Sequence, residues 1–410
     1  MTERTIRTIG LFGLFGVDNL GNDATLAATI HALKSRLPNA RLILVSDPPN
    51  ASAAVGAFDA HVAHDLLPVT DYLRWIKPYW IRERVRGALQ RATEPLRRFR
   101  TRKIAKQIDL LLIAGTGIAD DYYQGPYDVP HDLLRWCAVV RGAGGLVRFA
   151  SIGAGPVTHP LSIRWFRTAL NIADYRSYRD HSSQRFALRI GVPAGNDLVL
   201  PDMVFSLPVP SGLKIQPRQW PPRTIGIGVM GYFGWNVSTE EGLRIYAKYI
   251  RKMRWLLSQL FQRKFAVRLL VGARKADQRA VDDILNSAEF EEERIGGRLG
   301  TSPATSYIDV FEEIAKTDFV IATRFHNVLF GLLLQRPCIS IEYGPKNTDL
   351  MTEMGFAEYC HSIETFDPAV VLQQFERQVA MTQPPLDVAR ARLTEYRELL
   401  GNQYDSVVKS

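Results

Sequence analysis

The chain has 410 residues, of which 46% are hydrophobic and 23% charged, values typical of a soluble globular protein with two or three domains. It contains no run of about 18 uninterrupted apolar residues, which excludes a membrane-spanning helix. The three cysteines are odd in number and far apart, which excludes a disulfide framework and the usual zinc-site spacings and favours a reducing cytoplasm.

The first half of the chain alternates strand-like and helix-like patterns. The apolar run at residues 8–13 predicts a buried strand and not a signal peptide, because no small-residue cleavage site follows it. Apolar residues at helical spacing predict a helix over residues 22–37, which Pro38 ends. Further strands are predicted at 41–45, 109–114 and 146–152, and further helices at 131–140, 162–171 and 181–189.

One segment accounts for the positive charge of the chain. Residues 71–106 contain twelve Lys or Arg and three acidic residues, an excess that equals the formal net charge of +9. The remainder is close to neutral, which argues against a nucleic-acid partner.

Within residues 72–100, apolar side chains recur at helical spacing among arginines. This composition is typical of an amphipathic helix at an anionic membrane surface. The alternative is a helical excursion over residues 68–106 that packs its apolar stripe on the N-terminal domain. The stripe consists of Val85, Leu89, Ala92, Leu96 and Phe99.

Residues 208–222 contain five prolines and are interpreted as an interdomain linker. Strands are then predicted at 224–229, 266–272, 318–322 and 337–342, and helices at 239–261, 327–334 and 387–400. The expected fold class is α/β, with two Rossmann-like doubly wound domains facing a cleft. The expected domains are residues 1–207 and 223–385, followed by a C-terminal helix and tail at 386–410.

Two glycine-rich loops follow predicted strands of the N-terminal domain. In the loop at residues 13–23, glycines permit close approach to an anion, and Asn22 or Asp23 is a candidate helix cap. The loop at residues 114–121 ends in Asp120 and Asp121, which are candidates to accept hydrogen bonds from sugar hydroxyls. For both loops the alternative is an ordinary tight turn with a capped helix or solvated acids.

Arg179 and Asp180 follow a glycine-rich turn at residues 151–156. Arg179 is expected at a strand end that points into the cleft. The alternative is a structural ion pair with a neighbouring carboxylate, which is the more common role of such an arginine.

The strongest group lies in the C-terminal domain. Arg324 and His326 follow a predicted strand and begin a helix that is apolar nearly all round, so they face the cleft unless they are paired. Arg offers a planar fork for phosphate or carboxylate, and His passes protons near neutral pH. Tyr343 and Lys346 follow the next strand. The alternative is a structural pair of Arg324 with Asp318 or Glu342.

With these residues identified, the chain resembles the polysaccharide pyruvyl transferase family from the first glycine loop to about Gly355. The Arg324-x-His326 element, followed by Pro337, Tyr343 and Lys346, is the most specific part of the resemblance. The Asn-x-Gly-x-Asp, Gly-rich, Ile-Gly-x-Gly-Pro, Arg-Asp-x-x-Ser and Pro-Asp elements occur in the family's order.

The resemblance implies a glycosyltransferase-B-like pair of domains, with the acceptor on the N-terminal and the donor on the C-terminal domain. It implies that phosphoenolpyruvate and a sugar, free or lipid-linked, give a pyruvate ketal and phosphate. No cofactor or metal is expected beyond the co-substrate phosphoenolpyruvate. The implied catalytic residues are His326 and Arg324, the donor contacts Arg324, Lys346, Tyr343 and Arg179, and the acceptor contacts Asn19, Asp23, Gly115, Gly117, Asp120 and Asp121.

The sequence departs from the family pattern in three places. It has Asn22-Asp23 where the family usually has Gly-Asp, and Thr116 where the family usually has a third glycine. Phe325 and Asn327 flank the histidine, where the family usually has Leu and a small residue. These departures concern the acceptor more than the reaction.

Two other functions stay open from the sequence. One is a nucleotide-sugar glycosyltransferase of the same architecture, with Glu342 or Asp349 as the carboxylate that binds the ribose. The other is a non-catalytic glycan-binding relative. The expected location is the cytoplasm, with peripheral attachment to the inner face of the membrane if the basic segment binds lipid.

Overall fold

A computed structural model describes residues 5–16, 18–45, 60–62, 79–119, 125–155, 157–210, 213, 215, 217–235 and 237–409. The chain forms two compact units. Unit 1 comprises Met1–Val17, Ala24–Leu207 and Tyr396–Ser410, and unit 2 comprises Asp18–Asp23 and Pro208–Glu395. This division differs from the expected domains in two places, because residues 18–23 group with unit 2 and the end of the last helix groups with unit 1.

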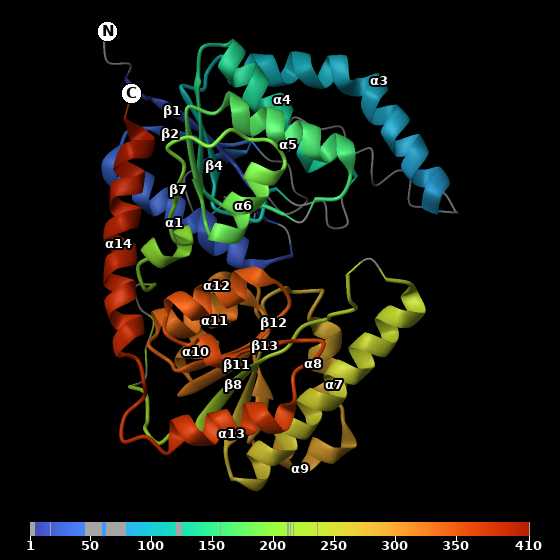
Figure 1. The fold of residues 1–410 in the computed structure, drawn as a ribbon, viewed down its shortest axis with the longest axis vertical. Helices are drawn as coiled ribbons and strands as arrows, with labels where there is room; N and C mark the ends of the chain where they lie inside the picture. The colour runs from blue at the N-terminus through green and yellow to red at the C-terminus, as the bar shows by residue number, and fades with distance from the viewer. Residues whose placement is uncertain are drawn as a thin grey trace. The chain divides into compact units, whose positions relative to one another are not determined.

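Unit 1 is built on a parallel sheet whose seven described strands have the order β3-β2-β1-β4-β5-β6-β7 (Figure 1). The strands are β1 Thr8–Phe12, β2 Arg41–Leu44, β3 Ala60–Val62, β4 Leu110–Ala114, β5 Leu146–Ile152, β6 Tyr175–Tyr178 and β7 Leu198–Val199. The strand order reverses between β1 and β4. In such sheets ligands bind beyond the carboxyl ends of the two strands at this switch point.

Helices cover both faces of this sheet. They are α1 Leu20–Arg36, α3 Tyr79–Ala105, α4 Val129–Gly142, α5 Pro160–Ile172, α6 His181–Arg189 and the 3-10 turn η2 Met203–Ser206. The end of α14 (Asp387–Val408) joins unit 1 through the ion pair of Arg36 with Asp405 and through the backbone carbonyl of Val407, which accepts a hydrogen bond from Arg148. These contacts explain why the last helix groups with unit 1.

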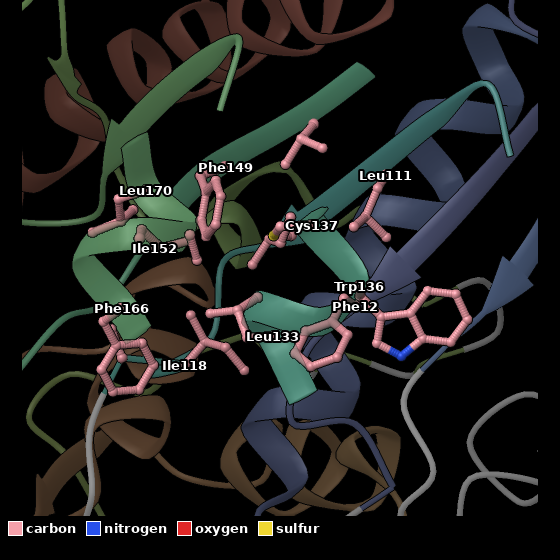
Figure 2. Packing of buried hydrophobic residues seen from close by; sticks show 14 of the residues in the cluster. Phe12, Leu111, Ile118, Leu133, Trp136, Cys137, Phe149, Ile152, Phe166 and Leu170 are labelled. Atoms are coloured by element: carbon pink, nitrogen blue, oxygen red, sulfur yellow. The ribbon is translucent and has the colours of Figure 1, made fainter. Parts of the chain in front are cut away.

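The hydrophobic core of unit 1 lies between the sheet and helices α4 and α5 (Figure 2). Trp136 of α4 and Phe166 of α5 are fully buried with Phe149 of β5. Burial of each such side chain contributes about 1.5–3 kcal/mol to folding. Burial also raises the pKa of the Cys137 thiol in this core, so Cys137 is a packing residue and not a nucleophile.

Unit 2 repeats the same plan with the described strand order β10-β9-β8-β11-β12-β13, in which all pairs are parallel (Figure 1). The strands are β8 Thr224–Gly228, β9 Ala266–Leu270, β10 Leu299–Thr301, β11 Phe319–Ala322, β12 Cys338–Glu342 and β13 Cys360–Ser362. The switch point lies between β8 and β11. The predicted α/β class with two Rossmann-like doubly wound sheets is therefore confirmed.

The helices of unit 2 flank its sheet. They are α7 Thr239–Gln262, α8 Gln278–Leu285, α9 Glu291–Ile295, α10 Tyr307–Ala315, α11 Phe325–Leu333, α12 Pro345–Glu353, α13 Pro368–Val379 and the 3-10 turns η3 Ala288–Phe290 and η4 Ala357–Tyr359. Helices α7 and α13 pack together on one face, and α10 and α11 pack together on the other (Figure 1). Across the described residues, no helix is both long and apolar enough to cross a membrane.

A buried carboxylate fixes the amino end of the sheet in unit 2. Asp318, directly before β11, accepts hydrogen bonds from the backbone N–H groups of Gln219 and Thr224 at 2.7 and 3.0 Å, and from that of Arg223 at 2.9 Å. Asp109 holds the equivalent place before β4 and accepts from the N–H groups at the start of β1. Asp318 is thus not the partner of Arg324, and its role is to anchor the chain that enters β8.

We expect the substitution Asp318→Ala to lower the free energy of unfolding by about 2–4 kcal/mol, because three backbone donors lose a charged acceptor. Urea titration followed by circular dichroism measures the change. Glu292→Ala, at an exposed position of α9, is the control and should change stability by less than about 0.5 kcal/mol. Equal effects of the two substitutions would contradict the anchoring role.

Candidate functional site

The candidate site lies at the switch point of unit 2, where β8 and β11 end. Arg324 occupies the N-cap position of α11, with extended backbone angles, and His326 lies in the first turn of that helix. The described residues of α11 are buried along its whole length. The apolar sequence that predicted a buried helix thus carries a cation and an imidazole to the carboxyl edge of the sheet.

The guanidinium of Arg324 is held by Asp277, a fully buried carboxylate that precedes α8. Nη2 of Arg324 lies 2.6 Å from Oδ1 of Asp277, and Nε lies 3.1 Å from both carboxylate oxygens. Asp277 also accepts the backbone N–H groups of Gly272 and Ala273 at 3.0 and 2.8 Å. Burial alone would lower the pKa of Arg324, but the Asp277 carboxylate outweighs it, and the pKa is raised.

This pair corrects the expected partner of Arg324, whereas the expectation that Arg324 contacts the donor stays a prediction. The sequence predicted a guanidinium that clamps the donor, with Asp318 or Glu342 as the alternative partner. Its partner is Asp277, which engages the Nε and Nη2 edge and neutralises the charge. Gly272 permits this approach, because a Cβ there would lie 2.8 Å from Cγ of Arg324. Asp277 therefore fixes the position of the Arg324 side chain at this edge of the sheet.

The first glycine loop belongs to the same site. The Asp18 carboxylate accepts the backbone N–H groups of Lys275 and Ala276 at 2.8 and 2.9 Å. Asn19 forms an antiparallel bridge with Ala273, and the N–H of Leu20 donates to the carbonyl of Gly272 at 3.0 Å. Residues 18–23 of the loop thus pack on the turn after β9 in unit 2, whereas the sequence assigned them to the N-terminal domain.

Gly21 of this loop lies directly against the ring of His326. A Cβ at Gly21 would lie 1.9 Å from Nδ1 of His326, so only glycine fits beside the imidazole as it stands. Asn19 is the cap of α1, since its Oδ1 accepts the N–H of Gly21 at 3.1 Å. The expectation that Asn22 or Asp23 caps this helix is therefore wrong, and Asp23 lies half-buried in its first turn.

Lys346 and Tyr343 join the cluster from the other side. The Nζ of Lys346, in the first turn of α12, lies 4.7 Å from the ring centre of Tyr343 and 5.6 Å from that of Phe325. Phe325 in turn contacts the His326 ring edge-on at 5.2 Å. Tyr343 also interacts with the Arg324 guanidinium. The structure thus brings Arg324, His326, Tyr343 and Lys346 together in unit 2.

A buried polar layer lies behind these side chains. The Tyr249 hydroxyl is 2.9 Å from Oγ1 of Thr323, and Nδ2 of Asn347 donates to Oγ of Ser340 at 2.9 Å. Burial raises the pKa of Tyr249, which therefore stays neutral. Asn327 is fully buried, and neither of its amide atoms makes a hydrogen bond within the described residues. Buried polar groups without a hydrogen bond are uncommon in folded proteins, and a catalytic role is one of the reasons for which they occur.

The glycine loop after β4 lies in unit 1. Gly115 has a φ of +24°, and a Cβ there would lie 2.8 Å from Sδ of Met203 in η2. The Oγ1 of Thr116 accepts the N–H of Leu14 at 3.3 Å, and Gly117 lies against Gly153. These contacts favour the tight-turn alternative for Gly115. Asp120 and Asp121 lie outside the described residues.

Arg179 also lies in unit 1, at the carboxyl end of β6. Its guanidinium contacts Asp202 at 3.2 Å and Asp180 at 3.5 Å. Burial would lower the pKa of Arg179, but the two carboxylates outweigh it, and the pKa is raised. These contacts are those expected of a structural ion pair. They do not support the expectation that Arg179 binds the donor, which stays a prediction.

Sequence reasoning missed three residues of the site, Asp18, Gly272 and Asp277, and Gly21 entered it only as a glycine of the first loop. A signal was present, since Gly272 ends a predicted strand and Asp277 lies five residues later. Nothing in the local sequence pairs that loop with residues 18–21 or with Arg324.

At the end of β12, burial raises the pKa of the Glu342 carboxyl. Within the described residues, no group of three or more His, Cys, Asp or Glu is placed to hold a metal ion.

Comparisons with known proteins agree with this architecture. The sequence model of the family described as polysaccharide pyruvyl transferase matches residues 19–345. No curated protein matches the chain in sequence. Similar solved structures include Anabaena HepE in complex with UDP and glucose, with 12% identity, a TM-score of 0.58, and coverage of 98% of this chain and 99% of that one.

Two UDP-GlcNAc 2-epimerases are similar in fold to the same degree. The enzyme from Methanocaldococcus jannaschii shares 10% identity at a TM-score of 0.57, covering 95% of this chain and 99% of that one. The Neisseria meningitidis enzyme bound to UDP-GlcNAc shares 10% identity at a TM-score of 0.55, covering 98% of both chains. At these identities the similarity shows the fold alone.

Gly21→Ala tests the packing at the imidazole. The added methyl group overlaps the His326 ring, so we expect a loss of about 1–3 kcal/mol in the free energy of unfolding and a shift of the His326 ring signals in NMR spectra. The control is Gly142→Ala in α4, where an added Cβ meets nothing within 4 Å. Unchanged His326 signals in Gly21→Ala would contradict the contact.

Proposed function

The chain belongs to the polysaccharide pyruvyl transferase family, and from this premise we propose that it transfers the enolpyruvyl unit of phosphoenolpyruvate to a sugar. By its description, the family consists of transferases that act on polysaccharides. The proposal adds the donor, and an acceptor that is a sugar of a surface or extracellular polysaccharide or of its lipid-linked precursor. The observation that carries it is the cluster of His326, Lys346, Tyr343 and Arg324 at the switch point of unit 2.

The reaction joins one donor to two hydroxyls. A proton adds to the methylene carbon of phosphoenolpyruvate, which leaves an oxocarbenium-like centre at C2. One sugar hydroxyl attacks this centre and the C–O bond to phosphate breaks, so that phosphate leaves. A second hydroxyl attacks the same carbon and closes the ketal. The two hydroxyls lose two protons, of which one balances the new methyl group and the other leaves with phosphate.

His326 is the proposed general acid or base of these steps. Its ring is held between Phe325 and Gly21, in the first turn of a buried helix, so its orientation is constrained before substrate binds. Proton transfer by a positioned imidazole contributes about 10²–10⁴-fold to a rate.

Lys346 is the proposed main contact for the negative charge of the donor. The charge of Arg324 is largely compensated by Asp277, whereas the Lys346 ammonium lies over the faces of Tyr343 and Phe325. An ammonium at the amino end of α12 attracts phosphate or carboxylate together with the helix dipole. Arg324, held in place by Asp277, then helps to shape the donor site, and Tyr343 lines that site.

The remaining contacts stay proposals from the resemblance. Asn19 and Asp23, Gly115 and Gly117, and Asp120 and Asp121 are the proposed acceptor side, and Arg179 is a proposed further donor contact. We propose no cofactor. We also propose that the reaction takes place in the cytoplasm, at the inner face of the membrane when the acceptor is lipid-linked.

The direct experiment incubates the purified protein with labelled phosphoenolpyruvate and a panel of glycan acceptors. We expect label in a ketal, stoichiometric release of phosphate, and no consumption of nucleotide sugars. His326→Gln should reduce kcat by at least about 100-fold with an unchanged circular dichroism spectrum. Sugar transfer from a nucleotide donor instead would favour the glycosyltransferase alternative, and a fully active His326→Gln variant would remove His326 from the chemistry.

Lys346→Met tests the donor contact without an acceptor. A ligand that binds the folded state raises the melting temperature by mass action, so phosphoenolpyruvate should stabilise the unsubstituted protein. We expect Lys346→Met to raise the Kd for phosphoenolpyruvate at least about tenfold, because it removes a charged contact. Lys248→Met, at an exposed position of α7, is the matched control. Equal thermal shifts in both variants would exclude Lys346 from the donor site.

A further inference from the structure

Around Arg97, helix α3 packs on unit 1 through a polar face, whereas at its carboxyl end Ile104 and Ala105 pack on the hydrophobic core. Its buried positions include Arg97 and Thr101. Nη2 of Arg97 contacts both carboxylate oxygens of Asp132 in α4 at 2.7 and 2.9 Å. Arg135 of α4 lies 3.0 Å from Asp132 and 3.5 Å from Glu94 of α3. Charged pairs therefore occupy the part of the α3–α4 interface around Arg97, where apolar side chains would usually lie.

The apolar stripe of α3 faces outward instead. Leu89, Leu96 and Phe99 are 39%, 44% and 69% exposed. These positions follow one face of a helix, since they are separated by seven and three residues. The alternative that this stripe packs on the N-terminal domain is thus wrong for these three side chains. An exposed apolar stripe on the side of a helix opposite its packed face is typical of a surface that binds another protein or a membrane.

The charge around the stripe is strongly positive. Helix α3 contains nine Lys or Arg and two Glu. Arg100 and Lys103 flank the stripe and are exposed, as are Arg98, Arg102 and Lys106 on the adjacent side. A cationic rim around an apolar stripe complements an anionic bilayer, whose headgroups attract the cations while the apolar side chains enter the interface. Nucleic acid would use the charge but leave the stripe uncovered.

A cavity of about 610 Å³ opens beside this rim, between the carboxyl end of α3 and helices α4 and α5. Its cationic lining includes Arg98, Arg102 and Lys106, of which Arg98 also pairs with Glu94 at 3.1 Å. Arg135, which pairs with Asp132, lines it as well, and its apolar lining includes Leu134 and Val139. His131, which also lines it, is neutral at pH 7 because burial lowers its pKa to about 4. A volume of this size accommodates a small ligand, and the lining suits a phosphate that carries an apolar tail.

We propose that α3 docks the protein on an anionic phospholipid bilayer, with Leu89, Leu96 and Phe99 in the interface and the Arg98–Arg102–Lys106 pocket on a lipid phosphate. This surface lies on the helical side of unit 1 and uses none of the residues proposed for donor or acceptor. This surface would account for the proposed location at the membrane, and its binding to lipid does not depend on pyruvyl transfer.

The test is sedimentation of the full chain with vesicles, in the absence of phosphoenolpyruvate and acceptor. One set of vesicles contains phosphatidylcholine alone, and the other contains added phosphatidylglycerol. We expect binding to the second set, weakened by salt, and at least about tenfold weaker binding to the first, because the charge of the lipid supplies much of the attraction.

Two variants separate the two parts of the surface. Leu96→Ser with Phe99→Ser should reduce vesicle binding at least about tenfold, and so should Arg102→Glu with Lys106→Glu. All four side chains are exposed, so the fold should persist, which circular dichroism verifies. The matched controls are Ile295→Ser, which is 76% exposed in α9, and Arg251→Glu, which is exposed in α7, and both should bind as the unsubstituted chain does.

Three results would overturn the proposal. The first is equal binding to both sets of vesicles, and the second is no binding to either. The third is a dimer in analytical ultracentrifugation that Leu96→Ser with Phe99→Ser abolishes while vesicle binding persists, since the stripe would then join two copies of the chain. Because no substrate is present, a failure here is distinct from a failure of pyruvyl transfer.

Discussion

The candidate site depends on one buried carboxylate. Asp277 binds Arg324 and the backbone N–H groups of Gly272 and Ala273, so a single charge joins the end of β11 to the turn after β9. A buried carboxylate without these partners would be costly, and so would a buried guanidinium without Asp277. The turn that Asp277 holds also carries Asp18 and Asn19, whose loop places Gly21 against His326. The position of the imidazole therefore follows from the pair.

Carboxylates have different partners at the amino and carboxyl ends of the strands. At the amino ends of β4 and β11, Asp109 and Asp318 accept backbone N–H donors and fix where the chain enters the first strand of each unit. At the carboxyl end of β9, Asp277 holds a side chain that belongs to the site. The two sheets repeat one plan, and the candidate site lies where the strand order of unit 2 reverses. Arg324 and Arg179 each form an ion pair with a buried carboxylate at the carboxyl end of a sheet.

Helix α3 shows that a hydrophobic stripe alone does not tell which face of a helix is buried. The usual rule places the apolar side inward. In the middle of α3, Arg97 on the inward side pairs with Asp132 of α4, which Arg135 of α4 also contacts, and Leu96 and Phe99 stay exposed, while Ala105 at the end of the helix is buried in the core. Such an arrangement gains little by burial of apolar area on folding, which is consistent with a surface whose apolar contacts form only with a partner.

The sequence by itself determined the α/β class, the helix from His181 to Arg189, and the buried character of α11, because these follow from local periodicity and from glycine and proline signals. It also identified Arg324, His326, Tyr343 and Lys346 as neighbours, since all follow adjacent strands. Only the tertiary structure decided that Asp277 is the partner of Arg324, that residues 18–23 belong to unit 2, and that the stripe of α3 faces outward. Those outcomes depend on contacts between residues far apart in the chain, and local patterns carry no information about which distant groups will meet.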